Sequence, residues 1–288
     1  MEKLTNDQLT VTVSAHGAEL QSIKDAGGRE YLWQADSAYW PKHSPTLFPI
    51  VCGLWKDTYR LDGKTYTMAR HGFASKSDFT LINHTDSRVT YALTDSEETL
   101  QMYPFHFNLS VTYRLDNNVL HVVWHVENTD RRELFFQIGG HPAFNVPGMQ
   151  PGDELCGCLR LDNPGAQRLY GNVGGCIVKG HHPLQMEGDV WHFGIHDFDD
   201  DALVFDESQL HDIALLNPDG TPAVTVNFRA PAVGIWSPTA KNAPFICIEP
   251  WYGIHDWAEF DGELSEKYLI NRLQPGASFM SEYTITIG

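Results

Sequence analysis

The sequence has few positive charges. Lys and Arg together number 20 against 37 Asp and Glu, which gives a formal net charge of −17. A field of that sign repels phosphate backbones and anionic membrane surfaces, so we expect neither a nucleic acid nor a membrane as a partner. A neutral small molecule meets no such repulsion.

Cysteine is also scarce, and long apolar runs are missing. The cysteines, at positions 52, 156, 158, 176 and 247, form neither an even-numbered disulfide framework nor a pair of zinc-type C-x-x-C motifs. The first residues, MEKLTNDQLT, lack the apolar core of a signal peptide, and no apolar run is long enough to span a membrane. These absences predict a cytoplasmic protein with free thiols.

Helix signals are sparse as well. One helical turn is expected over residues 95–101, which begin with an Asp-x-x-Glu pattern. Strand-like alternation dominates, and residues 107–115 and 120–126 around the turn 116–118 predict a hairpin. Further strands are expected at 9–13, 89–93, 202–205, 213–216, 223–228, 245–248 and 279–287, whereas residues 147–200 are expected to form long loops.

Many short strands separated by Gly, Pro, Asn and Asp are typical of packed antiparallel sheets. The length of 288 residues suits one large all-β domain with a substantial core, and no internal repeat or linker divides the chain. The sequence therefore predicts an all-β antiparallel sandwich in a single domain spanning residues 1–288.

Two ionisable residues stand next to apolar segments in a way that suggests chemistry. His141, in QIGGHPAFNV, lies between Gly140 and Pro142, and a stiff backbone of glycine and proline should aim its imidazole. Glu249 follows the apolar run 245–248. A carboxylate at the end of a buried strand is costly unless it is paired, or unless its raised proton affinity is used.

A third candidate is His71, in ARHGFA, after a strand-like segment. Each histidine alone could instead serve a structural role by hydrogen-bonding a backbone carbonyl, and Glu249 could form a buried ion pair with an arginine. Aromatic residues near these sites offer flat apolar faces that suit the C–H faces of sugar rings, with core packing as the alternative. They are Phe73, Phe144, Trp251, Tyr252 and Trp257.

Other groups give weaker signals. His192 and His196 have i, i+4 spacing, but no helix is expected there to bring both to one face, so a solvated acidic loop is favoured over a metal site. Cys156-Gly-Cys158 alone is also a weak metal motif. No phosphate-binding loop, dinucleotide fingerprint or G-x-S-x-G motif is present.

Taken together, seven segments resemble the aldose 1-epimerase (galactose mutarotase) family, in its LacX-like branch. They are HSPTLFPIV (43–51), HGFA (71–74), YPFHF (103–107), GGHPAFNVP (139–147), DALVF (201–205), GIWS (234–237) and CIEPWYG (247–253). The resemblance implies a large twisted β-sandwich, called a supersandwich, with the sugar in a cleft on one sheet. It also implies interconversion of the α and β anomers of a free aldose without a cofactor.

The resemblance also implies roles for individual residues. Glu249 matches the catalytic glutamate, His141 the catalytic histidine and His71 a second active-site histidine, while Asp201 is the preferred sugar-binding member of the pair Asp200-Asp201. A carboxylate base and an imidazolium acid on opposite sides of the ring would remove the O1 proton and protonate the ring oxygen. Neither a metal nor another cofactor is needed. The other expected substrate-binding residues are Arg70, Phe73, Asn145 and Trp251.

The chain departs from the family pattern at two positions. Gly53 stands where relatives in this branch usually have an arginine, and Ser75 where they tend to have another, so Arg70 or Lys76 is expected to supply the missing charge. Together with the acidic composition, these departures favour a free aldose over a sugar phosphate, in a monomer or homodimer. The alternatives are a sugar-binding or sensing protein with little turnover and, third, a glycoside-processing enzyme that pairs Glu249 with Asp201.

Overall fold

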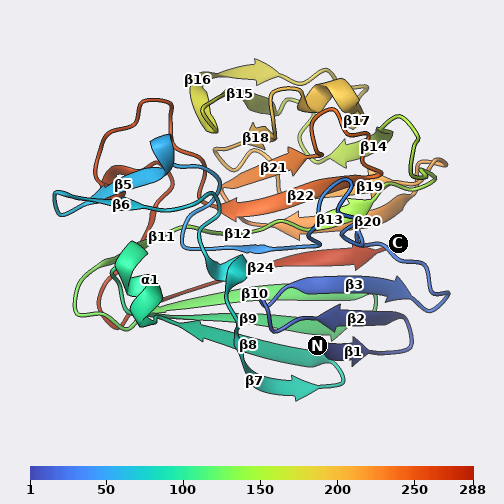
Figure 1. The fold of residues 1–288 in the computed structure, drawn as a ribbon. Coiled ribbons are helices and arrows are strands. Elements are labelled where there is room, and N and C mark those ends of the chain that lie inside the picture. The colour runs from blue at the N-terminus through green and yellow to red at the C-terminus, as the bar shows by residue number, and fades with distance from the viewer.

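The computed structural model covers residues 1–288, and its description excludes the side chains at positions 170–172 and 179. Two large antiparallel sheets dominate the described part of the chain (Figure 1). The first has the order β17 (Val190–Gly194), β14 (Cys156–Leu161), β19 (Asp212–Leu216), β20 (Pro222–Phe228), β24 (Ser278–Ile287), β10 (Val119–Asn128), β9 (Phe107–Asp116), β8 (Arg88–Thr94), β7 (Thr80–Thr85). We call it the long sheet.

The second sheet, called the site sheet below, lies above strands β24, β10, β9, β8 and β7 of the long sheet in Figure 1. Its order is β16 (Cys176–Pro183), β15 (Gln167–Val173), β18 (Leu203–Phe205), β21 (Ala232–Trp236), β22 (Phe245–Tyr252), β12 (Ile138–Gly140), β4 (Thr46–Leu47), with β13 (Ala143–Asn145) also paired to β22. Smaller antiparallel sheets join β1 (Glu2–Thr5), β2 (Leu9–Val13) and β3 (Leu20–Asp25), then β5 (Thr58–Leu61) with β6 (Lys64–Thr67), and β11 (Leu134–Phe136) with β23 (Asn271–Leu273). The all-β class and the antiparallel sandwich are confirmed.

The hairpin predicted around residues 116–118 is confirmed as β9 and β10. Asp116 pairs with Val119, and Asn117 adopts the left-handed backbone (φ 52°) that a tight turn requires. The odd-numbered residues of β9 and the even-numbered residues of β10 are buried. They form one face of the main apolar core, which lies between the two large sheets.

Strand β22 is covered on both faces, and this positions the site. Ile246 and Ile248 join the core shared with the long sheet. The alternate residues, Cys247, Glu249 and Trp251, lie on the opposite face of the site sheet, because successive side chains of a strand alternate. The continuous apolar run 245–248 reflects this double burial. The sequence had placed Glu249 at a strand end, whereas the strand continues through Tyr252.

Two other sequence expectations are wrong in detail. The helical segment α1 is Glu97–Met102, and its N-cap is Ser96, whose hydroxyl accepts from the Thr99 amide. Asp95 instead accepts hydrogen bonds from His106 Nδ1 and the Phe107 amide. Residues 147–200 are not long loops, because they contain β14 to β17. The apolar–polar alternation of these strands is hard to recognise in the sequence, because they contain glycines and because the pairing of β15 with β16 is short and bulged.

Among the described residues, no helix is long and apolar enough to cross a bilayer.

Candidate active site

A pocket of about 280 Å³ opens on the face of the site sheet that carries Glu249. Strands β21 and β22 supply Trp236, Glu249 and Trp251, and the other lining residues come from the loops that enter β4, η1 (Trp55–Asp57), η2 (Ala74–Lys76), β13 and β18. Ten residues line it: Trp40, Cys52, Arg70, His71, His141, Asp201, Ala202, Trp236, Glu249 and Trp251. Six of the eight residues expected from the sequence are therefore brought together.

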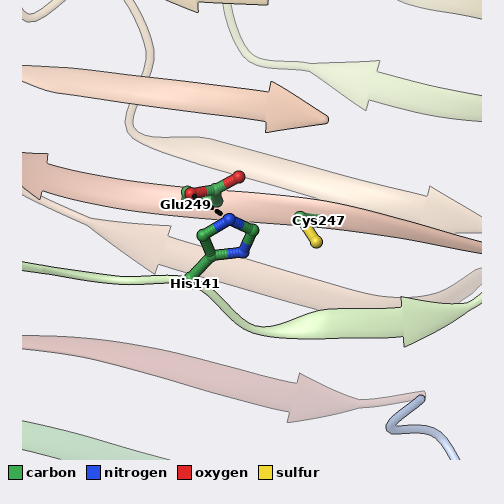
Figure 2. Close-up of side chains that lie close together, drawn as sticks. All are labelled: His141, Cys247 and Glu249. Carbon is green, nitrogen blue, oxygen red and sulfur yellow. Dashed lines mark ion pairs between the residues drawn. The ribbon is translucent and has the colours of Figure 1, made fainter. Parts of the chain in front are cut away.

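Glu249 and His141 both line the pocket, and their side chains point toward each other (Figure 2). The carboxyl rises from β22 and the imidazole from the turn between β12 and β13, so that Glu249 Oε2 lies 3.3 Å from His141 Nε2. Both side chains are almost fully buried. Glu249 Oε2 and His141 Nδ1 nevertheless have no hydrogen-bond partner among the described residues.

The backbone fixes the direction of His141 as expected, but for a different reason. The His141 amide donates to the Pro45 carbonyl at 3.1 Å. Gly139 and Gly140 have ordinary backbone angles and serve instead to leave room. A Cβ on Gly139 would lie 2.7 Å from Trp251 Cδ1, and one on Gly140 would lie 2.9 Å from the Tyr283 hydroxyl.

Burial shifts the proton affinities of the pair in opposite directions. It raises the pKa of Glu249 well above its usual range, an effect that Arg70 reduces and Asp201 increases. The pKa of His141 is lowered to about 3, mainly by burial; a hydrogen bond with its own backbone opposes this effect, and the positive charges of Arg70 and Lys42 add to it. The low-dielectric pocket thus favours the form in which both side chains are neutral. Whether Glu249 and His141 are both neutral or form an ion pair, the pair carries the same number of protons, and one proton can lie on either group.

His71 is a neutral hydrogen-bond donor toward the pocket. Its Nδ1 accepts from the Cys52 amide at 3.1 Å, and an amide can only donate, so the ring proton resides on Nε2. Burial holds the pKa of His71 well below its usual range, and the nearby His141 and Arg70 lower it further. His71 and Gly72 both have positive φ, and a Cβ on Gly72 would collide with the Phe48 carbonyl. This turn directs the imidazole toward His141, whose ring centre is 5.5 Å away.

Arg70 supplies the positive charge of the pocket. Its Nη2 donates to Asp201 Oδ2 at 2.8 Å and lies 3.4 Å from His255 Nε2. Because a guanidinium only donates, His255 Nε2 is the acceptor, and the proton of this buried ring is on Nδ1, which has no described partner. Asp201, preferred from the sequence over Asp200, is the member of that pair in the pocket lining.

Two tryptophans that the sequence analysis did not assign to the site form its walls. Trp40 stacks on His141, with ring centres 4.8 Å apart and an interplanar angle of 26°. Trp236 meets the same imidazole edge-on at 5.5 Å. Trp236 lies in the GIWS segment and Trp40 just before HSPTLFPIV, so proximity to the family segments was a signal that could have identified both.

Trp251 lies across the floor of the pocket. Besides facing Gly139, its indole covers Gly234, the cross-strand partner of Glu249, where a Cβ would collide with the ring. Its Nε1 makes no hydrogen bond of good geometry, but it lies close enough to Glu249 to act against the rise in the pKa of that carboxyl. The two glycines therefore allow a large flat side chain to lie on the sheet beside the carboxyl.

Asn145 and Phe73 lie outside the pocket. The Asn145 amide donates to the backbone carbonyls of Glu30 and Leu32, which is a structural role. Phe73 packs in the main core and borders a separate cavity, which is also lined by Lys76. Of the two residues expected to supply the missing charge, Arg70 lines the pocket and Lys76 does not.

Gly53 cannot carry an arginine without rearrangement. A Cβ there would lie 2.7 Å from the Gly175 carbonyl oxygen, and the Gly53 carbonyl already accepts from the Asp256 amide. The backbone packing around position 53 therefore accommodates glycine and leaves no room for a larger residue without rearrangement.

Two groups of potential metal ligands have their ligand atoms within 4.8 Å of one another in the described part of the chain. One is His141, Cys247 and Glu249 (Figure 2), and the other is His181, Asp206 and Glu207. His192 and His196 do not form such a group, since His196 instead faces Asp199.

Comparisons with known proteins identify the family and the fold. A sequence model of the family described as aldose 1-epimerase matches residues 2–155. The chain is 30% identical to the chromosomal protein LacX of Lactococcus lactis subsp. lactis, over 99% of this chain and 98% of that protein. Two solved structures are similar: a galactose mutarotase related enzyme from Lactobacillus acidophilus (35% identity, TM-score 0.91, 100% of this chain and 97% of that one) and a galactose mutarotase-like protein from Lactobacillus casei ATCC 334 (31%, TM-score 0.94, 100% of both).

The opposite pKa shifts predict opposite pH dependence of stability for two variants. Above the usual pKa of glutamate, the native state binds more protons at Glu249 than the unfolded state does, so wild-type stability falls as pH rises. Below pH 6.5 the unfolded state binds more protons at His141, so wild-type stability falls as pH drops toward 3. Each slope is at most about 1.4 kcal/mol per pH unit.

Glu249→Gln should therefore gain stability relative to wild type as pH rises above about 4.3, the ordinary glutamate pKa. His141→Gln should gain relative stability as pH falls below about 6.5. Urea unfolding between acid and mildly alkaline pH measures both differences, with the exposed Glu259→Gln as the matched control. Differences that do not change with pH would show that neither group is shifted in the folded protein.

Proposed function

Because the chain belongs to the aldose 1-epimerase family, we propose that it interconverts the α and β anomers of a free monosaccharide in this pocket. One observation carries the proposal. Three lining residues have a buried polar atom without a described hydrogen bond: Glu249 Oε2, which faces only His141 Nε2 at 3.3 Å, His141 Nδ1 and Trp251 Nε1. Buried polar groups are rarely left unpaired, and a small molecule rich in hydroxyls would pair them.

The shared proton of Glu249 and His141 suits ring opening. From the neutral pair, transfer of the carboxyl proton to His141 gives the carboxylate and the imidazolium. Glu249 then removes the proton from O1 while His141 protonates the ring oxygen, and the bond from C1 to that oxygen breaks to give the open aldehyde. Rotation about C1–C2 presents the other face of the carbonyl. Reclosure returns both protons with the roles reversed, so the enzyme ends unchanged. Positioned acid–base groups of this kind typically contribute about 10² to 10⁴ each in rate.

The placement of the two groups fits this exchange, although it differs from the sequence expectation. They do not stand on opposite sides of an empty ring site, because their nearest atoms are 3.3 Å apart. O1 and the ring oxygen are bonded to the same carbon, so the two protons move at neighbouring positions. An adjacent carboxyl and imidazole can reach both oxygens of one anomeric centre.

The remaining lining residues are proposed to bind the sugar. His71 Nε2–H and the Arg70 guanidinium would donate to hydroxyl oxygens, while Asp201 would accept from a hydroxyl. Trp40 and Trp236 would cover the apolar face of the ring and exclude water from His141. No step requires a metal or a redox carrier.

A sugar-binding protein without turnover is the second candidate. A carboxyl and an imidazole that are buried together and shifted in opposite directions favour catalysis, since neither is needed only to hold hydroxyls. The reading of Glu249 and Asp201 as a glycosidase pair is weaker, because Asp201 is occupied by Arg70.

The first test is anomer exchange followed by NMR on a panel of free and phosphorylated aldoses. Wild type should accelerate exchange of at least one free aldose, and Glu249→Gln and His141→Gln should each lower kcat by about a hundredfold or more. The exposed Glu259→Gln and His196→Gln are the matched controls and should match wild type. Exchange no faster than in buffer, with sugar binding intact, would select the binding-protein alternative.

The second test concerns Arg70. Removing its guanidinium should raise KM for a free aldose by about tenfold, with a smaller effect on kcat, because hydrogen bonds to charged groups are worth about 1.5 to 3 kcal/mol. Lys76→Ala is the control, since Lys76 lines a different cavity. If Arg70→Ala kept the wild-type KM, the guanidinium would have no contact with the sugar.

A further inference from the structure

A buried thiol lies beside the Glu249–His141 pair, and the proposed reaction does not use it. Cys247 precedes Glu249 by two residues on β22, so its side chain is on the same face of the site sheet. It is buried and forms no disulfide. One ligand atom from each of Cys247, Glu249 and His141 lies within 4.8 Å of the other two (Figure 2). Sulfur, oxygen and nitrogen donors are therefore gathered at one point.

The distance within the pair suits a tetrahedral metal centre. Zn²⁺ binds imidazole nitrogen and carboxylate oxygen at about 2.0 to 2.2 Å, so a tetrahedral angle puts these two ligand atoms about 3.4 Å apart. Glu249 Oε2 lies 3.3 Å from His141 Nε2. Glu249 Oε2 makes no described hydrogen bond that a cation would have to replace. The carboxyl and the imidazole therefore stand at the spacing of two ligands of one metal ion.

We propose that Cys247, Glu249 and His141 bind a divalent transition-metal cation of the Zn²⁺ type, which inhibits the protein by occupying its acid–base pair. Thiolate, carboxylate and imidazole are the donors that Zn²⁺ sites in proteins use, and a water molecule would take the fourth position. Starting from the neutral side chains, binding releases one proton from the thiol and one from the carboxyl to the solvent. The metal site does not depend on the proposed function, whereas the inhibition rests on it.

The charges around the three groups are compatible with a bound cation. Burial makes a lone thiolate or carboxylate costly here, but a divalent cation with one of each forms a group of no net charge. The pKa of His141, about 3, keeps the imidazole neutral at pH 7, which is the form that binds a metal. Arg70, which lines the same pocket, is offset by Asp201 at 2.8 Å.

The location of the three ligands predicts both access and selectivity. Glu249 and His141 line the pocket, so an ion can reach them from the solvent, whereas Cys247 is buried in a cluster with Ala143 and Phe245. A thiolate favours ions such as Zn²⁺ and Co²⁺ over Mg²⁺ and Ca²⁺, which prefer oxygen ligands. Mg²⁺ should therefore neither bind at this point nor inhibit.

Co²⁺ is the probe of the site, because its thiolate charge-transfer absorption reports a cysteine ligand directly. Chelator-treated, reduced full-length protein should bind one equivalent and show this band, which excess Zn²⁺ should remove and excess Mg²⁺ should not. Cys247→Ser should abolish the band. Glu249→Gln keeps the thiol and should weaken Co²⁺ binding by more than the roughly 10- to 100-fold that loss of an outer-shell partner costs.

Two other thiols provide matched controls. Cys52 lines the same pocket, and Cys158 contacts His192 on the long sheet. Cys52→Ser and Cys158→Ser should both retain the full band. The metal site is overturned if no thiolate band forms, or if the band survives in Cys247→Ser and disappears in either control.

Inhibition is measured for each variant as the ratio of its anomer-exchange rates with and without Zn²⁺. Saturating Zn²⁺ should lower the wild-type rate by about a hundredfold or more, because both acid–base groups are occupied. A saturating aldose should weaken Co²⁺ binding, and Cys247→Ser should need much more Zn²⁺ for the same ratio. A bound ion that leaves the exchange rate unchanged would overturn the inhibition. Wild type that exchanges no aldose would overturn the proposed function, and the Co²⁺ band would still decide the metal site.

Discussion

The site depends on the burial of one carboxyl beside one imidazole. Glu249 and His141 lie 3.3 Å apart, away from water, and each keeps a polar atom without a described partner. Burial makes charge costly on both groups and leaves one proton to be exchanged between them. The surrounding charges modify this arrangement without removing it: Arg70 favours the ionised carboxyl, and Arg70 and Lys42 favour the neutral imidazole.

The fold provides this environment by covering both faces of one sheet. Strand β22 places isoleucines toward the long sheet and Glu249 and Trp251 toward the pocket, so its central position gives the carboxyl a rigid base. Small residues are required where the large indole lies on the strands, at Gly139 and Gly234. A stability cost at Glu249 and His141 is the expected consequence of keeping a proton-exchange pair dry.

Most of the fold could be predicted from alternation in the sequence, as in β9 and β10, where each strand has one polar and one apolar face. Residues 147–200 could not, because glycines and bulges interrupt the period of two. In the site, Glu249, His141 and His71 were identifiable where ionisable groups interrupt apolar segments. Asn145 was misassigned because its backbone partners, Glu30 and Leu32, are remote in sequence. Trp40 contacts His141, about a hundred residues away along the chain, so its only signal in the sequence was its position just before the HSPTLFPIV segment.

The protonation state of Glu249 in the empty pocket tests this account most directly. Difference infrared spectroscopy, with Glu249→Gln to assign the signal, can follow the protonated carboxyl of this residue as pH is raised. The account predicts that the band of the buried acid persists well above the usual pKa of glutamate, and that saturating sugar changes its intensity or frequency. A Glu249 carboxyl that ionises in the usual range, and does not respond to any sugar on the panel, would contradict the central claim.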